Sequence, residues 1–213
     1  MKSTISILVI EDRANHIADC KAMIETERTR LPIQVNVLWA NNLEEALSLL
    51  DQADAVMTDV FFPSISGGND EEPSGQKVVE QCLAKCMPVV WVTSTYHHGK
   101  KTNSVNGWGR EHGLEMFDCR DGGDPYANVE GTHKPWKDAF YGLLGLIVAL
   151  EEEFCVFCDG KIMRKSWGDE YDAHDCAGHL SYYLLSGADP KESGDSIMIP
   201  VLEKMKAMGF PKD

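Results

Sequence analysis

Three short apolar runs in the first half of this chain are each followed or closed by a polar side chain that could do chemistry. Glu11 and Asp12 follow the first run, and Asp59 closes another. Thr93 follows a third, and Lys134 lies further along, directly before a proline. Carboxylates gathered at one point repel one another, so such a site favours a hard divalent cation with oxygen ligands, most readily Mg²⁺. A cation, a nucleophilic carboxylate, a hydroxyl and an ammonium group together predict phosphoryl transfer through an aspartyl-phosphate.

These residues would meet if the apolar runs were neighbouring parallel strands. The first half of the chain alternates short apolar runs with amphipathic stretches, which is typical of βαβ units around a parallel sheet. In a doubly wound sheet, ligands bind beyond the carboxyl ends of the strands, where the strand order reverses. We therefore expect the polar residues to lie together at that edge. The expected strands are residues 5–10, 35–40, 55–60, 88–92 and 114–117, and the expected helices are residues 15–28, 43–50, 78–83 and 136–154.

The helix expected at residues 136–154 is apolar on nearly all sides between Ala139 and Leu150. A helix that covers one face of a sheet normally keeps a polar stripe towards solvent. Its second face must therefore be buried as well, either by residues 155–213 or by a partner chain in a homodimer. Residues 155–213 carry apolar patches of their own, so packing within the chain is the favoured interpretation. We expect two units, residues 1–154 and a mainly helical extension of residues 155–213.

The composition disfavours several classes of function. The formal net charge is −14 and the chain has no basic run, whereas a nucleic-acid partner requires clustered lysines and arginines. The longest apolar run, residues 141–150, is far shorter than a membrane span, and the first residues do not resemble a signal peptide. Seven cysteines, an odd number without an export signal, favour reduced thiols in the cytoplasm. We expect a cytoplasmic protein without nucleic-acid or membrane partners.

Five segments, spread over roughly residues 4–154, resemble the receiver domain of bacterial response regulators in two-component signalling. ILVIED carries the acidic pair, DAVMTDVFFP carries Asp59, PVVWVTS carries Thr93, HKPW carries Lys134, and NNLEEALSLL matches a helix. Each segment alone is a weak signal, but the five occur in the order that the family shows. The resemblance implies a flavodoxin-like α/β fold with a doubly wound sheet of five parallel strands.

The resemblance also implies a role for each residue of the site. Asp59 would be the phosphoacceptor, Thr93 would hydrogen-bond the phosphoryl group, and Lys134 would pair with it. The phosphoryl donor would be a histidine kinase or a phosphotransfer protein, and the output would be contact with an unidentified downstream protein rather than DNA binding. The Mg²⁺ ligands would be the side chains of Glu11, Asp12 and Asp59 and the backbone carbonyl of Phe61.

The chain departs from the family in one region. The interval from Thr93 to Lys134 is longer than usual, so an insertion lies there, and the aromatic residue expected two positions before the lysine is a threonine. Counted without the insertion, Phe117 takes the aromatic position and Arg120 that of the lysine. We favour Lys134 as the cation, because the following proline holds it in an extended conformation directly before a helix. A pseudo-receiver, which keeps the fold as a binding module without phosphoryl chemistry, is the alternative. A metal-dependent hydrolase of another α/β family is disfavoured because no second acid follows Asp59.

Residues 155–213 contain candidate metal ligands of another kind. Cys155 and Cys158 form a CxxC motif, and His174, Cys176 and His179 follow it. Zinc sites often pair a CxxC motif with a second pair of ligands at a comparable distance. The second cluster has no clean paired spacing, and Cys155 follows directly on an apolar helix, where buried thiols are common. We therefore favour a structural role for these cysteines over a zinc site or a redox-active CxxC motif.

Overall fold

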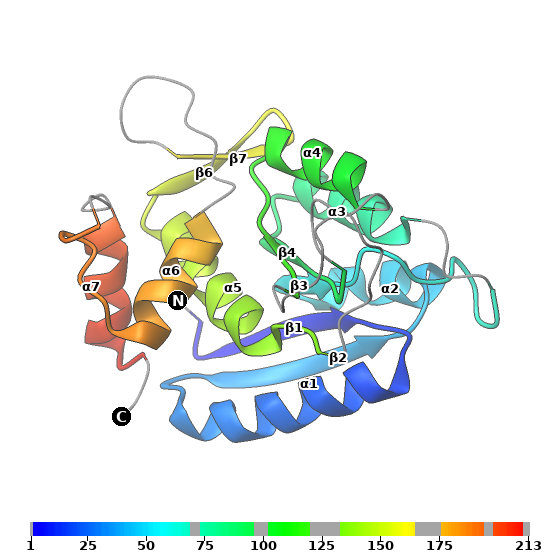
Figure 1. The fold of residues 1–213 in the computed structure, drawn as a ribbon, viewed down its shortest axis with the longest axis horizontal. Helices are drawn as coiled ribbons and strands as arrows, with labels where there is room; N and C mark the ends of the chain where they lie inside the picture. The colour runs from blue at the N-terminus through cyan, green and yellow to red at the C-terminus, as the bar shows by residue number, and fades with distance from the viewer. Residues whose placement is uncertain are drawn as a thin grey trace.

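The computed structural model describes residues 2–68, 73–95, 102–119, 133–164, 176–193 and 198–210 (Figure 1). Its strands are β1 (Thr4–Ile10), β2 (Gln34–Ala40), β3 (Ala55–Thr58), β4 (Val89–Val92), β5 (Met116–Phe117), β6 (Cys155–Cys158) and β7 (Lys161–Arg164). Its helices are α1 (Ala14–Glu27), α2 (Leu43–Leu49), α3 (Ser74–Ala84), α4 (Asn103–Glu111), α5 (Trp136–Glu151), α6 (Cys176–Ser186) and α7 (Ile199–Met208), with short 3₁₀ turns η1 (Arg28–Arg30) and η2 (Leu50–Gln52). Within these described ranges, no helix is long and apolar enough to cross a membrane.

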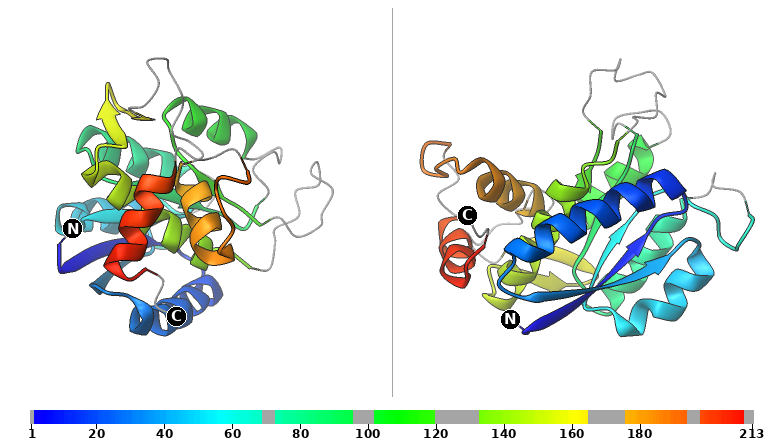
Figure 2. Two further views of the ribbon diagram at one scale, coloured as in Figure 1. Left: turned by 90° about the vertical axis from the view of Figure 1, so that its left-hand side faces the viewer. Right: turned by 90° about the horizontal axis from the view of Figure 1, so that it is seen from below.

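The core is a sheet of five parallel strands in the order β2-β1-β3-β4-β5. The strand order reverses at β1, because the chain first places β2 on one side of β1 and then β3, β4 and β5 on the other. Both β3 and β4 are buried along their whole length, as expected for parallel strands covered on both faces. Helices α1 and α5 cover one face, and α2 and α3 cover the other (Figure 2). The predicted doubly wound α/β fold with five parallel strands is confirmed.

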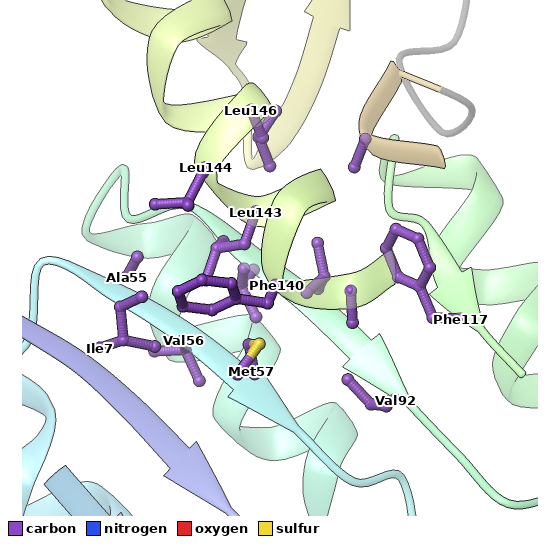
Figure 3. Packing of buried hydrophobic residues seen from close by; sticks show 14 of the residues in the cluster. Ile7, Ala55, Val56, Met57, Val92, Phe117, Phe140, Leu143, Leu144 and Leu146 are labelled. Atoms are coloured by element: carbon purple, nitrogen blue, oxygen red, sulfur yellow. The ribbon is translucent and has the colours of Figure 1, made fainter. Parts of the chain in front are cut away.

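Helix α5 is the central element of the packing. On one side, Phe140 and Leu143 lie over Ile7 of β1 and Met57 of β3 (Figure 3). All four side chains are fully buried. The helix therefore anchors the middle of the sheet and holds its own amino-terminal end at the edge where the strands end.

The other side of α5 is covered by α6 and α7 (Figure 2). Glycines let the helices approach closely. A Cβ atom at Gly142 would lie 2.9 Å from the carbonyl oxygen of Ala177, and one at Gly145 would lie 2.8 Å from the Cβ atom of Leu180. The part of the chain that follows α5 thus buries the second face of that helix, as its apolar pattern predicts.

The structure corrects the expected element boundaries after residue 151. Helix α5 ends at Glu151 rather than at residue 154, and the chain then forms an antiparallel hairpin of β6 and β7 before the helices of the C-terminal part. The hairpin turns at Asp159 and Gly160, whose φ angles are 48° and 75°, as a tight two-residue turn requires. The Asp-Gly pair is a turn signal in the sequence, but strands of four residues are too short for a clear periodicity.

Candidate functional site

The carboxyl ends of β1, β3 and β4 meet at one edge of the sheet. Ile10 lies opposite Thr58 in the parallel register of β1 and β3, so the next residues on the two strands, Glu11 and Asp59, are neighbours. The backbone N–H of Asp59 donates to the carbonyl of Ile10 over 3.0 Å. Thr93 follows β4, the strand on the other side of β3. Strand pairing therefore brings the predicted residues to one place.

Glu11, Asp12 and Asp59 form a carboxylate cluster. One carboxylate oxygen from each residue lies within 4.8 Å of the others. Glu11 and Asp59 are buried, and Asp12 is half-buried. Several carboxylate oxygens gathered in one place are the donor set that a hard divalent cation such as Mg²⁺ prefers. The structure brings together the three side chains that the sequence predicted as metal ligands.

Lys134 reaches the carboxylate cluster from the segment that precedes α5. Its Nζ atom lies 2.5 Å from Oε2 of Glu11 and 2.7 Å from Oδ2 of Asp59, and its side chain is fully buried. The N–H of Trp136 donates to the carbonyl of Lys134 over 2.8 Å, and the Trp136 ring centre lies 5.5 Å from Nζ. Pro135 is the N-cap residue of α5. Lys134 thus pairs with two buried carboxylates and offsets part of their negative charge.

The segment in which the resemblance implies an insertion includes the residues between the end of β5 and Lys134. Phe117 ends β5, and its ring packs so closely on α5 that a Cβ atom at Gly142 would lie 2.4 Å from it. Its carbonyl accepts a hydrogen bond from the N–H of Thr93 over 2.9 Å. Phe117, the aromatic residue of the count without an insertion, is therefore present together with Lys134, the lysine of the count with an insertion. Arg120, the alternative cation, lies outside the described residues.

The hydroxyl and carboxylate at the ends of β4 and β3 are held by local backbone hydrogen bonds. Oγ1 of Thr93 accepts from the N–H of Thr95 over 3.1 Å, and Oδ1 of Asp59 accepts from the N–H of Val60 over 2.7 Å. Thr93 is 2% exposed. Both groups are thus held in place at adjacent strand ends.

The loop after Asp59 returns to the site at the start of α3. Phe61, predicted to offer its backbone carbonyl, lies at the beginning of this loop and is half-buried; its role as a metal ligand stays a prediction. The N–H of Gly75 donates to the carbonyl of Val60 over 3.0 Å. A Cβ atom at Gly75 would lie only 2.1 Å from the carbonyl oxygen of Asp59. Sequence reasoning missed Gly75, although a glycine just inside a helix is a recognised sign of close packing.

Burial perturbs two titratable groups at the site. It raises the pKa of Glu11 to about 7, an effect that Lys134 opposes and Asp59 reinforces. Burial also lowers the pKa of His16 on α1, and the positive charge of Lys134 acts in the same direction. His16 is 2% exposed, and its Nδ1 atom has no hydrogen-bond partner in the described part of the chain. Sequence reasoning missed His16, whose one signal is its position one turn before Cys20 on the buried stripe of α1.

A cavity of about 530 Å³ opens beside Lys134. Its walls come from the end of β5, from the segment before α5 and from α6. Asp118 lines it on the sheet side, and Gly178 and Tyr182 line it on the α6 side. The C-terminal part of the chain therefore lines a cavity that Lys134 also lines.

The two cysteines of the CxxC motif of β6 differ in their exposure to solvent. Residues three apart on a strand point to opposite faces, and Cys155 is accordingly buried whereas Cys158 is exposed. His174 lies outside the described residues. Among the residues that the structure describes, the carboxylate cluster is the one group of three or more metal-binding side chains that lie close together.

No protein-family model matches this chain, and neither a curated protein nor a solved structure matches it. Its fold and its carboxylate cluster are therefore the observations that bear on function. An open parallel sheet binds ligands at the edge where its strand order reverses. The cluster lies at that edge.

Proposed function

We propose that this chain is a phosphorylation-dependent signalling switch of the response-regulator receiver type, in which Asp59 accepts a phosphoryl group. The observation that carries the proposal is the contact of Asp59 with the buried Lys134 inside a carboxylate cluster at the sheet edge. Such a site combines a nucleophilic carboxylate with a fixed positive charge for the phosphoryl oxygens. Residues 1–154 would form the receiver unit, and residues 155–213 would form an extension packed against it.

The residues of the site fit a bound Mg²⁺ ion, because the donor set is three carboxylates with oxygens at compatible spacing. Bound there, the ion would neutralise negative charge on the phosphoryl oxygens. Its ligands would be Glu11, Asp12, Asp59 and the carbonyl of Phe61.

The side chains of the site have distinct tasks before and after transfer. Lys134 forms an ion pair with Asp59, and the N–H of Val60 fixes one of the aspartate oxygens. Asp59 would attack the phosphorus of the donor. As the new O–P bond forms, the bond from phosphorus to the donor breaks, and the electron pair leaves with the donor, such as the imidazole of a phosphohistidine. Lys134 and the hydroxyl of Thr93 would then bind the phosphoryl oxygens.

Phosphorylation would be transmitted from the site to α5 and α6. Thr93 is hydrogen-bonded to Phe117, whose ring contacts Gly142 of α5 where the carbonyl of Ala177 of α6 also approaches. A shift of Thr93 towards the phosphoryl group would therefore disturb the contact between these helices. We propose a histidine kinase or a phosphotransfer protein as the donor, and contact with a downstream protein, in the cytoplasm, as the output.

One observation favours the second candidate, a pseudo-receiver that binds a partner without phosphoryl chemistry. Lys134 already pairs with Glu11 and Asp59, so part of the negative charge of the buried site is compensated without a further ligand. In that case the three residues would serve as a structural ion-pair network that holds the start of α5 on the sheet.

Intact-mass analysis after incubation with acetyl phosphate and Mg²⁺ separates the two candidates. We expect a gain of about 80 Da, lost in Asp59→Asn. Asp54→Asn is the matched control, because Asp54 precedes the same strand at its opposite end and pairs with Lys2; it should be phosphorylated like the wild type. Phosphorylation that persists in Asp59→Asn would refute the assignment, and a wild type that is never modified would support the pseudo-receiver.

A further inference from the structure

The C-terminal part of the chain contains a pair of buried thiols on two different elements. Cys155 is the first residue of β6, and Cys176 is the first residue of α6. Their sulfur atoms lie 3.3 Å apart, and both residues are 0% exposed. The sequence draws attention to Cys155 and Cys158, but the fold pairs Cys155 with a cysteine that is 21 positions away.

We propose that Cys155 and Cys176 are a redox-active pair that is oxidised to an intrachain disulfide. The S–S bond is about 2 Å long, so the two sulfur atoms need to approach by only about 1 Å more. The contact between the two thiols allows either sulfur to react first. In the proposed reaction Cys176 is the attacking thiol and Cys155 the resolving one.

The oxidant that suits a buried pair is small, such as hydrogen peroxide. The thiolate of Cys176 attacks one peroxide oxygen, the O–O bond breaks, and a sulfenic acid and one water form. The sulfur of Cys155 then attacks the sulfenic sulfur, the S–O bond breaks, and the second water leaves. Two electrons pass from the sulfur atoms to the peroxide, and the two thiol protons end in the water molecules.

The bond would join the start of β6, which follows α5, to the start of α6. Helix α6 lies along α5, where Gly145 leaves room for Leu180, and its residues Gly178 and Tyr182 line the cavity beside Lys134. A cross-link between these elements restricts the separation of α6 from α5. Oxidation therefore fixes one wall of that cavity. The inference goes beyond the proposed function and stands whether or not Asp59 is phosphorylated.

The test is peptide mapping of the full chain without reduction, after treatment with hydrogen peroxide and alkylation of the remaining thiols in denaturant. We expect a linked peptide pair that contains Cys155 and Cys176, with a loss of about 2 Da relative to the two thiols. This measurement needs only the wild type, so its outcome does not depend on whether a variant folds. Oxidation of the exposed Cys86 and Cys158 while the pair stays reduced would overturn the proposal, because it shows that the oxidant was effective.

Amide exchange of α6 gives a second readout. Oxidation should slow exchange in α6 by roughly tenfold or more in the wild type, and should leave it unchanged in Cys155→Ala. Cys82→Ala, which removes a buried cysteine of α3 outside the pair, should behave like the wild type. Equal exchange in the oxidised and reduced wild type would contradict the proposal that the bond holds α6, as would slowing that persists in Cys155→Ala.

Discussion

Replacement of Glu11 by glutamine should change how the stability of the fold depends on pH. Burial raises the pKa of Glu11 from 4.5 to about 7, and one pKa unit corresponds to about 1.4 kcal/mol. Protonation of this fully buried carboxyl therefore stabilises the metal-free fold by about 3 kcal/mol. Because the folded-state pKa lies above the unfolded one, the contribution is fully present below about pH 4.5. It is lost as the pH rises through about 7.

The measurement is urea unfolding in the presence of a chelator, at about pH 5 and about pH 8. Between these values the wild type should lose roughly 2–3 kcal/mol more stability than Glu11→Gln. The amide of the variant does not titrate, and Lys134 keeps its partner Asp59. Glu203→Gln, at an exposed glutamate of α7, controls for the loss of one carboxyl and should follow the wild type.

Added Mg²⁺ should act in the opposite direction in the wild type. A bound cation requires ionised carboxylates, so Mg²⁺ should stabilise the protein more at about pH 8 than at about pH 5. Identical pH dependence of wild type and Glu11→Gln would refute the reasoning, because Glu11 would then have the same pKa in the folded and unfolded chains.

Four further predictions concern the site and its surroundings. Lys134→Ala should still accept phosphate but lose the accompanying change in amide exchange around β4, whereas Arg120→Ala should keep it; the reverse pattern would assign the cation to the arginine. Asp12→Ala should weaken Mg²⁺ binding by tenfold or so, and calorimetry that finds unchanged affinity would remove it from the ligand set. Gly75→Ala should destabilise the fold by about 1–3 kcal/mol in urea unfolding, because its Cβ atom would meet the carbonyl oxygen of Asp59. Gly107→Ala on α4, where the same atom meets open space, should be neutral or stabilising; equal effects would contradict the packing argument. Finally, no gel shift that survives competitor DNA is expected at physiological salt, because the net charge is −14.

Much of the fold and of the carboxylate cluster could be predicted from local sequence patterns. Strands covered on both faces need apolar residues at every position, so β1, β3 and β4 are visible as continuous runs. A polar residue that directly follows such a run must lie at the end of the strand. Glu11 and Asp59 could therefore be placed at one edge of the sheet without knowledge of any contact.

The return of distant segments to that edge could not be predicted in the same way. Lys134 contacts a carboxylate 123 positions earlier. The sequence left Arg120 as an alternative, because the number of residues in a long connection does not fix where the chain returns to the sheet. The same holds for Cys155, whose nearest thiol belongs to α6 and not to its own CxxC motif. Periodicity reports which face of its own element a residue occupies. Which element covers that face depends on packing between segments far apart in the chain, and only the tertiary structure decides it.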